Sequence, residues 1–136
     1  MVSNRIKESI LARLSPKRPI AVLPIYTDVA RIRDAVDDPA LRRRFSHFSS
    51  KLLLVSRLEP EKNPCLALRS FAQGAPESAC LIILGEGSER SRLEELVREL
   101  GIADRVFFEG FTNPAPYYKL ADLVLVTSKY EGYGLV

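Results

Sequence analysis

Four apolar runs, separated by amphipathic segments, dominate the chain from residue 51 onward. None of the four alternates strictly between apolar and polar residues. We predict strands at 52–56, 80–84, 105–109 and 122–127. Because strands that are buried on both faces form continuous apolar runs, the pattern predicts an α/β fold, with a mostly parallel sheet covered by helices on both faces.

The segments between the runs have the apolar spacing of helices. In 88–100, leucines and a valine recur at spacings of three, four and seven residues, and a glycine follows. We predict helices at 3–14, 39–47, 64–73, 88–100 and 115–120. A short strand is expected at 20–23, and residues 26–38 have no firm period.

The first apolar run leads into a polar loop that contains two cations, Arg57 and Lys62. The loop ends at residues 63–64, an Asn-Pro pair typical of a helix N-cap and first helical residue. Ligands of open α/β sheets bind at the carboxyl ends of strands, and helix N-termini favour anions, so the loop is typical of a diphosphate site. The alternative is that both cations are solvated and paired with Glu59 and Glu61.

The second run ends in Gly85-Glu86-Gly87, which invites a dinucleotide-binding interpretation with Glu109 as the acid that binds the ribose. The motif is incomplete, because Arg90 occupies the place of the third glycine. A tight turn near a ligand, with Ser88 capping the next helix, is the favoured interpretation of these glycines.

The last run is followed by Glu131 and by the glycines 132 and 134. Two glycines let backbone amides approach a ligand closely, and a carboxylate accepts hydrogen bonds from sugar hydroxyl groups. The alternative is a glycine-rich turn with an exposed glutamate.

Composition narrows the classes of function. The chain has 136 residues and a net charge of +3, from 20 basic and 17 acidic residues. The length predicts one domain. The charge balance argues against a nucleic-acid partner, and the run Arg42-Arg43-Arg44 is interpreted as a solvated face. Cys65, Cys80 and His47 have no metal-ligand spacing, so we expect no metal site. Unpaired cysteines fit a reducing compartment, and we expect a cytoplasmic protein.

Several segments together resemble one family. They are VSRLEPEKN, LIILGEGSER, RVFFEGFTN, YYKLAD and SKYEGYGLV, in that order. The chain resembles the donor-binding domain of retaining glycosyltransferases with the GT-B fold, of the family 4 type. The resemblance implies a Rossmann-like three-layer sandwich, one half of a GT-B fold. It also implies a linker or interdomain helix over 1–19 and a nucleotide-sugar-binding domain over 20–136, incomplete at its C-terminus.

The resemblance assigns roles to individual residues. Arg57 and Lys62 match the pair that holds the donor diphosphate, and Glu131 matches an acid that contacts the donor sugar region. The backbone near Thr112 matches a position that reads the base, and Ser56 stands where the family usually has glycine. The expected contacts with the nucleotide sugar are Ser56, Gly85, Gly87, Thr112, Gly132, Tyr133 and Gly134.

The implied activity is hexosyl transfer, with retention, from a nucleoside-diphosphate sugar such as a UDP- or GDP-sugar, without a cofactor or metal. The second acid of the family's Glu-x7-Glu motif and the acceptor domain are absent, so we expect this chain to be an inactive fragment. We expect it to self-associate through an uncovered apolar face. A parent enzyme with a lipid acceptor would associate peripherally with a membrane. The alternatives are a non-catalytic nucleotide-binding or interaction module and a nicotinamide-binding domain.

Overall fold

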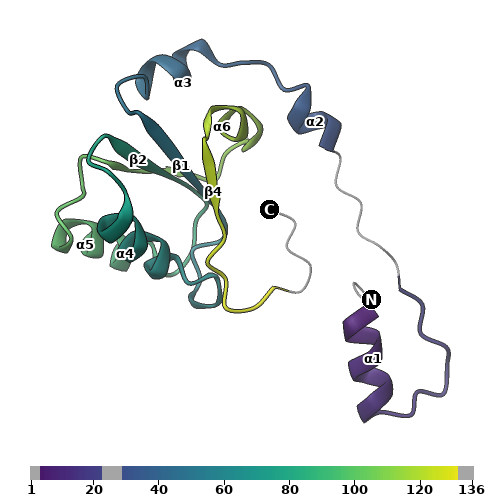
Figure 1. Cartoon of the computed structure of the whole chain (residues 1–136). Helices are drawn as coiled ribbons and strands as arrows, with labels where there is room; N and C mark the ends of the chain where they lie inside the picture. The colour runs from purple at the N-terminus through teal and green to yellow at the C-terminus, as the bar shows by residue number, and fades with distance from the viewer. Residues whose placement is uncertain (1–3, 23–28, 132–136) are drawn as a thin grey trace. The chain divides into compact units, whose positions relative to one another are not determined.

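The computed structural model describes residues 4–22 and 29–131. The chain divides into two compact units. The first contains the helix α1 (Asn4–Arg13), which has no buried residue. The second, over residues 29–130, contains every other element (Figure 1). In the described part of the chain, no helix has the length and apolar character that crossing a membrane requires.

The second unit is built on a four-stranded sheet. Its strands are β1 (Ser50–Val55), β2 (Ala79–Leu84), β3 (Val106–Gly110) and β4 (Leu123–Leu125). Their order is β3-β2-β1-β4, and all pairs are parallel. The predicted parallel α/β sheet is therefore confirmed.

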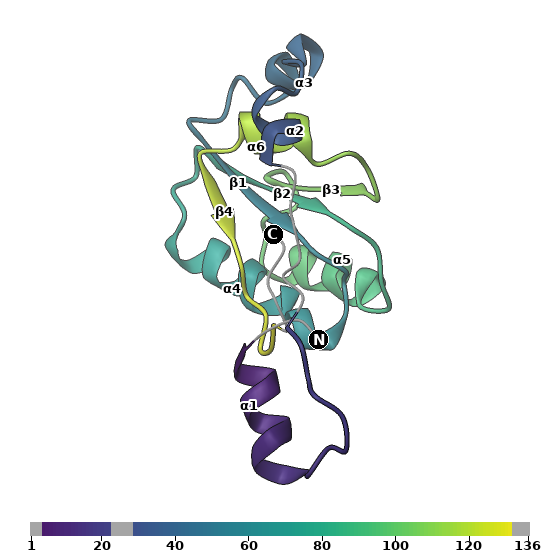
Figure 2. The ribbon, with the colours of Figure 1, turned by 90° about the vertical axis from the view of Figure 1, so that its right-hand side faces the viewer.

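Helices cover both faces of this sheet (Figure 2). On one face lie α4 (Pro64–Gly74) and α5 (Arg90–Glu99), and on the other lie α3 (Pro39–Arg44) and α6 (Ala115–Leu120). Successive strand side chains point to opposite faces, so Leu54 joins the core beneath α4 and α5, and Leu53 joins the core beneath α3 and α6. The Rossmann-like three-layer sandwich is confirmed.

The central position of β2 explains its sequence. All its residues are buried, with exposures of 2% or less. A strand with neighbours on both edges and helices on both faces has no side open to water, so it contains no polar residue. The predicted helices of this unit form, α4 beginning at Pro64 as expected.

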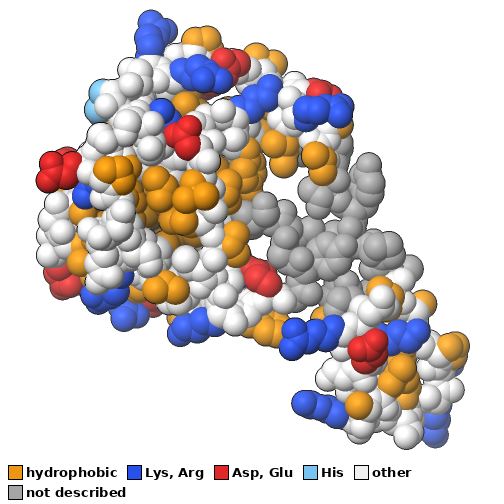
Figure 3. Space-filling view, viewed as in Figure 1, with side chains coloured by type: hydrophobic (Ala, Val, Ile, Leu, Met, Phe, Trp, Pro, Cys, Tyr) orange, Lys and Arg blue, Asp and Glu red, His pale blue; other side chains and the backbone are white. Residues whose placement is uncertain are grey.

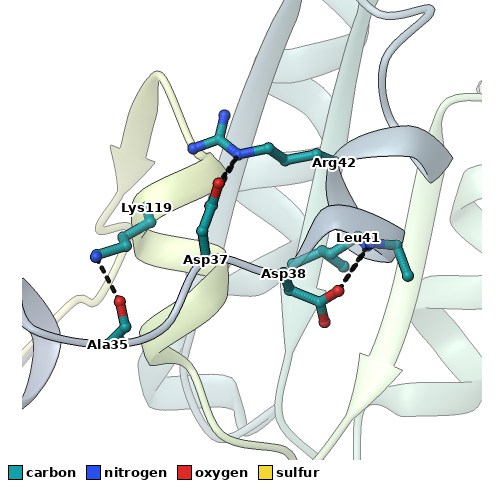
Figure 4. Close-up of polar contacts among 7 residues, drawn as sticks. Ala35, Asp37, Asp38, Leu41, Arg42 and Lys119 are labelled. Carbon is teal, nitrogen blue, oxygen red and sulfur yellow. Dashed lines mark hydrogen bonds and ion pairs between the residues drawn. The ribbon is translucent and has the colours of Figure 1, made fainter.

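The segment before the sheet is held by polar contacts that Figure 4 shows. Asp38 Oδ1 accepts hydrogen bonds from the backbone N–H groups of Ala40 and Leu41, the second and third residues of α3, at 2.9 and 3.1 Å, and so caps the helix. Arg42 pairs with Asp37 at 2.7 Å. Lys119 of α6 donates to the carbonyl oxygen of Ala35. These contacts tie residues 35–38 to two helices of the same unit, α3 and α6.

Some expected bounds differ from the structure. Residues 20–22 form no strand, and residue 23 lies outside the described residues. An unpredicted short helix, α2 (Val29–Arg33), lies in the segment without a clear period and contacts α6. The last strand is shorter than expected, because β4 is an edge strand that pairs only along Leu52–Leu54 of β1.

The β4 edge exposes apolar side chains (Figure 3). Leu123 is 54% exposed, Val124 37% and Val126 61%. Uncovered apolar surface of this kind is what self-association of the chain would bury, and that association stays a prediction.

Candidate functional site

Three loops meet at the carboxyl edge of the sheet, after β1, β2 and β3. Because the strands are parallel neighbours, their carboxyl ends lie at one edge. Backbone hydrogen bonds join the loops: Leu58 N–H donates to Glu86 O at 2.9 Å, Glu89 N–H donates to Leu58 O at 2.9 Å, and Gly85 N–H donates to Gly110 O at 2.7 Å. The loops therefore form one connected backbone frame.

Two of the predicted glycines are required by this close approach. Gly85 has φ +131°, and a Cβ added there would lie 1.9 Å from the Ser56 carbonyl oxygen. A Cβ on Gly87 would lie 2.4 Å from the Leu58 carbonyl oxygen. Any other residue would force the β1 and β2 loops apart.

A carboxylate also joins the two loops. Glu59 accepts a hydrogen bond from the Ser88 N–H at 3.1 Å and another from the Ser88 hydroxyl at 2.7 Å. These bonds lower the pKa of Glu59, because they stabilise its charged form. The expectation that Ser88 caps α5 is wrong: Glu89 precedes the helix, and Ser88 is engaged by Glu59.

The first loop contains the predicted cations. Arg57 is 69% exposed and pairs with Glu61 at 2.7 Å, as the solvated-loop alternative expected for this pair. Asn63 precedes α4 but makes no side-chain cap hydrogen bond; its φ is +51°, so its backbone rather than its side chain makes the turn. The ion pair is exposed, and a ligand phosphate can replace Glu61 as the partner of Arg57.

A hollow of about 550 Å³ opens where the three loops meet. Its lining residues are Val55, Ser56, Arg57, Leu84, Gly85, Glu86, Phe111, Thr112 and Pro114. The volume lies in the range of small-molecule sites, which are mostly apolar with few polar groups. Arg57 supplies a positive charge to the lining, and Glu86 supplies a carboxylate that pairs with Arg90 at 3.4 Å. The hollow therefore has the size and chemistry for a ligand with both an anionic and an apolar part.

The structure brings four of the predicted residues together around this hollow, namely Ser56, Arg57, Gly85 and Thr112. The Ser56 Oγ is buried and has no hydrogen-bond partner among the described residues. Lys62 and Gly87 belong to the same joined loops but stand outside this lining.

The segment after β4 runs beside the loop after β1. Thr127 Oγ1 donates to the carbonyl oxygen of Lys62 at 3.0 Å, and Lys129 N–H donates to that of Glu61 at 2.9 Å. Lys62 ends η1 (Pro60–Lys62), a short 3-10 helix. These two bonds hold the segment after β4 against the loop that contains Arg57 and Lys62.

Glu131 is exposed, and it belongs to the other compact unit of the chain. Gly132, Tyr133 and Gly134 lie outside the described residues. The roles predicted for these four residues at a donor sugar stay predictions.

The acid of the dinucleotide interpretation is already occupied. Both carboxylate oxygens of Glu109 contact Arg44 at 2.8 Å, and Oε2 also accepts the Tyr117 hydroxyl at 2.9 Å. The Glu109 side chain is only 11% exposed. Burial and this hydrogen bond raise the pKa of Tyr117 to about 12. Because Glu109 joins α3, β3 and α6, this chain presents no ribose acid at that position.

Sequence reasoning missed part of the lining. Val55 and Leu84 are the last residues of β1 and β2, and Glu86, Phe111 and Pro114 lie in the loops. The sequence marks these five residues as site candidates only by their position, because they lie near or after the end of a predicted strand. Within residues 4–22 and 29–131, no group of three or more His, Cys, Asp or Glu side chains is placed to hold a metal ion.

Comparison with known proteins defines the class. Residues 43–136 match the family model described as glycosyl transferases group 1, and the chain belongs to this family. It is 32% identical, over 90% of its length, to the N-acetylgalactosamine-N,N'-diacetylbacillosaminyl-diphospho-undecaprenol 4-alpha-N-acetylgalactosaminyltransferase of Campylobacter jejuni, of which it covers 32%. The chain thus spans about a third of the length of that curated relative.

Solved structures agree on the fold. S. aureus TarM, a mutant of which was solved with Fondaparinux, alpha-GlcNAc-glycerol and UDP, matches 98% of this chain and 26% of its own, with a TM-score of 0.77 and 21% identity. HepE from Anabaena, solved with UDP and glucose, matches 79% of this chain and 30% of its own, with a TM-score of 0.62 and 26% identity. The fold is that of one Rossmann-like half of a GT-B glycosyltransferase.

Proposed function

We propose that this chain is the donor-binding part of a retaining glycosyltransferase of the family 4 type. In this proposal the hollow binds a nucleoside-diphosphate sugar such as a UDP- or GDP-sugar. The observation that carries it is the hollow between the β1, β2 and β3 loops, which Arg57 lines together with apolar side chains, two hydroxyl groups and the carboxylate of Glu86. The HepE structure was solved with UDP and glucose, which supports this ligand class.

Breaking the glycosidic bond of such a donor leaves negative charge on the diphosphate. Arg57 and Lys62 would stabilise that charge, together with the amides of the joined loops, and Glu131 and the residues after it would contact the sugar. The proposed reaction is hexosyl transfer with retention, and the acceptor side belongs to the whole protein. The proposal assigns no step to a metal, and donor binding in the presence of EDTA tests that part.

The test compares UDP, GDP and ADP binding by calorimetry in the wild type and in Arg57→Ala. A charge-assisted hydrogen bond is worth about 1.5–3 kcal/mol, so the variant should bind about 10- to 150-fold more weakly. Arg92→Ala is the matched control, because Arg92 is 70% exposed and pairs with Glu89 as Arg57 pairs with Glu61. Equal affinities of wild type and Arg57→Ala, or a loss shared with Arg92→Ala, would contradict the assignment.

A non-catalytic nucleotide-binding module would pass the same binding test. Turnover of the whole protein separates the two functions. If Arg57→Ala lowers turnover in the whole protein, the transferase is supported. If the whole protein binds the nucleotide but transfers no sugar from UDP- or GDP-sugars, the module is favoured.

A further inference from the structure

Phe111 stands out among the apolar residues of the chain. Its side chain is 93% exposed, and it lies at the hollow rather than on a remote surface. Leaving a Phe in water forgoes the stabilisation that burial of a large apolar side chain provides. Because the ring lines a hollow of ligand size, it is available to pack against a bound ligand.

The backbone on both sides of Phe111 is held in place. Before it, Gly110 has φ +71° and accepts the Gly85 N–H at 2.7 Å. After it, Asn113 Oδ1 accepts the Ala115 N–H at 3.2 Å, where α6 begins. The ring is therefore presented outward by a fixed turn.

The two ends of the hollow differ in chemistry. Phe111, Thr112 and Pro114 follow β3, whereas Arg57 follows β1. In the sheet, β2 lies between these strands, so the axes of β1 and β3 are about two strand spacings, or 9–10 Å, apart. A ligand that spans the hollow would place its anionic part near Arg57 and a flat apolar part near Phe111.

We propose that the Phe111 ring stacks on the base of the bound nucleotide. This inference rests on the proposed function. It adds a side-chain contact, from Phe111 in the loop after β3, to the contact with the base that is proposed for the backbone near Thr112. Stacking uses the face of the base, which every base offers. Phe111 therefore contributes affinity for nucleotides in general, and base choice is left to groups that read the edge of the base.

The experiment measures binding of UDP, GDP, ADP and inorganic pyrophosphate to the full 136-residue chain by calorimetry. We expect Phe111→Ala to weaken nucleotide binding by about 5- to 150-fold and to leave pyrophosphate binding unchanged, because pyrophosphate has no base to stack. Phe111→Tyr should bind like the wild type. Val36→Ala, which truncates another residue that is 85% exposed, is the matched control and should have no effect.

A second variant gives an independent readout. The chain contains no tryptophan, so Phe111→Trp introduces a single indole at the proposed stacking position. Nucleotides should quench its fluorescence, and pyrophosphate should not.

The outcomes separate the two proposals. If Arg57→Ala weakens nucleotide binding but Phe111→Ala does not, stacking is wrong and the donor site stands. Equal weakening of nucleotide and pyrophosphate binding by Phe111→Ala would also overturn stacking. If the wild type binds none of the three nucleotides, both proposals fail.

Discussion

Replacing Gly85 by alanine tests whether the site depends on direct contact between two loop backbones. The added Cβ would lie 1.9 Å from the Ser56 carbonyl oxygen, whereas real Cβ contacts are essentially never shorter than 3.0 Å. The loop after β1 must therefore move by about 1.1 Å relative to Gly85. That loop carries Arg57, so the displacement reaches the proposed diphosphate end of the hollow.

The cost follows from the bonds at this position. A non-glycine residue at φ +131° is strained by about 1–3 kcal/mol. The displacement also stretches two backbone hydrogen bonds, from Gly85 to Gly110 at 2.7 Å and from Ser56 to Leu84 at 3.0 Å. With about 1 kcal/mol for each, the free energy of unfolding should fall by about 3–5 kcal/mol. That is a large part of the 5–15 kcal/mol typical of a folded domain.

Other glycines separate strain from steric contact. Gly101 has φ +68° with open space around it, so Gly101→Ala should cost only the strain, about 1–2 kcal/mol. Gly87→Ala isolates the steric contact instead. Its added Cβ would lie 2.4 Å from the Leu58 carbonyl oxygen, and Gly87 does not have a positive φ. Gly74→Ala, at the open end of α4, should change stability by less than about 1 kcal/mol, in the stabilising direction.

The assay is urea unfolding followed by circular dichroism, with nucleotide binding measured in parallel. Gly85→Ala should be the least stable of the series, and any folded fraction should bind nucleotide more weakly than Gly101→Ala. If Gly85→Ala were as stable as Gly101→Ala, the backbone contact would not hold the loops, and the reasoning would be refuted.

Three further predictions follow from single side chains. Ser56→Ala removes a buried hydroxyl that has no hydrogen-bond partner among the described residues. The free energy of unfolding, measured in urea, should therefore rise by about 1 kcal/mol. A fall in that free energy would show that the hydroxyl has a partner. The pKa of Tyr117 is raised from 10.0 to about 12, so its contribution to stability is complete below pH 10 and is lost as pH rises toward 12. Unfolding of Tyr117→Phe should therefore depend less on pH in that window, and an identical dependence would contradict this. Burial raises the pKa of Cys80 to about 11. A thiol reagent should therefore modify Cys65 first, and Cys80 only after unfolding. Equal rates of modification of the two thiols in the folded chain would show that Cys80 is accessible.

The strands and helices of the sheet unit could be predicted because their signals are local. The run at β2 is apolar throughout, and only a strand covered on both faces needs such composition. Pro64 sets the start of α4 for a similar reason, since proline is favoured at the first turn of a helix.

Local signals failed where a distant partner competed for the same group. Ser88 is a good capping residue by type, yet Glu59, 29 residues earlier, engages both its N–H and its hydroxyl. Glu109 follows a strand as a ribose acid would, yet Arg44, 65 positions away, neutralises it. Neither partner could be identified by spacing along the chain.

The amino-acid sequence by itself determined the α/β class, the turns at Gly85 and Gly87, and the presence of a cation after the first strand. Each of these depends on residue type and on near neighbours. Only the tertiary structure decided the strand order β3-β2-β1-β4, and this order brings Arg57, which follows β1, and Phe111, which follows β3, to the lining of one hollow. Strand order depends on pairing between segments far apart in the chain, and periodicity within a segment carries no information about its partner.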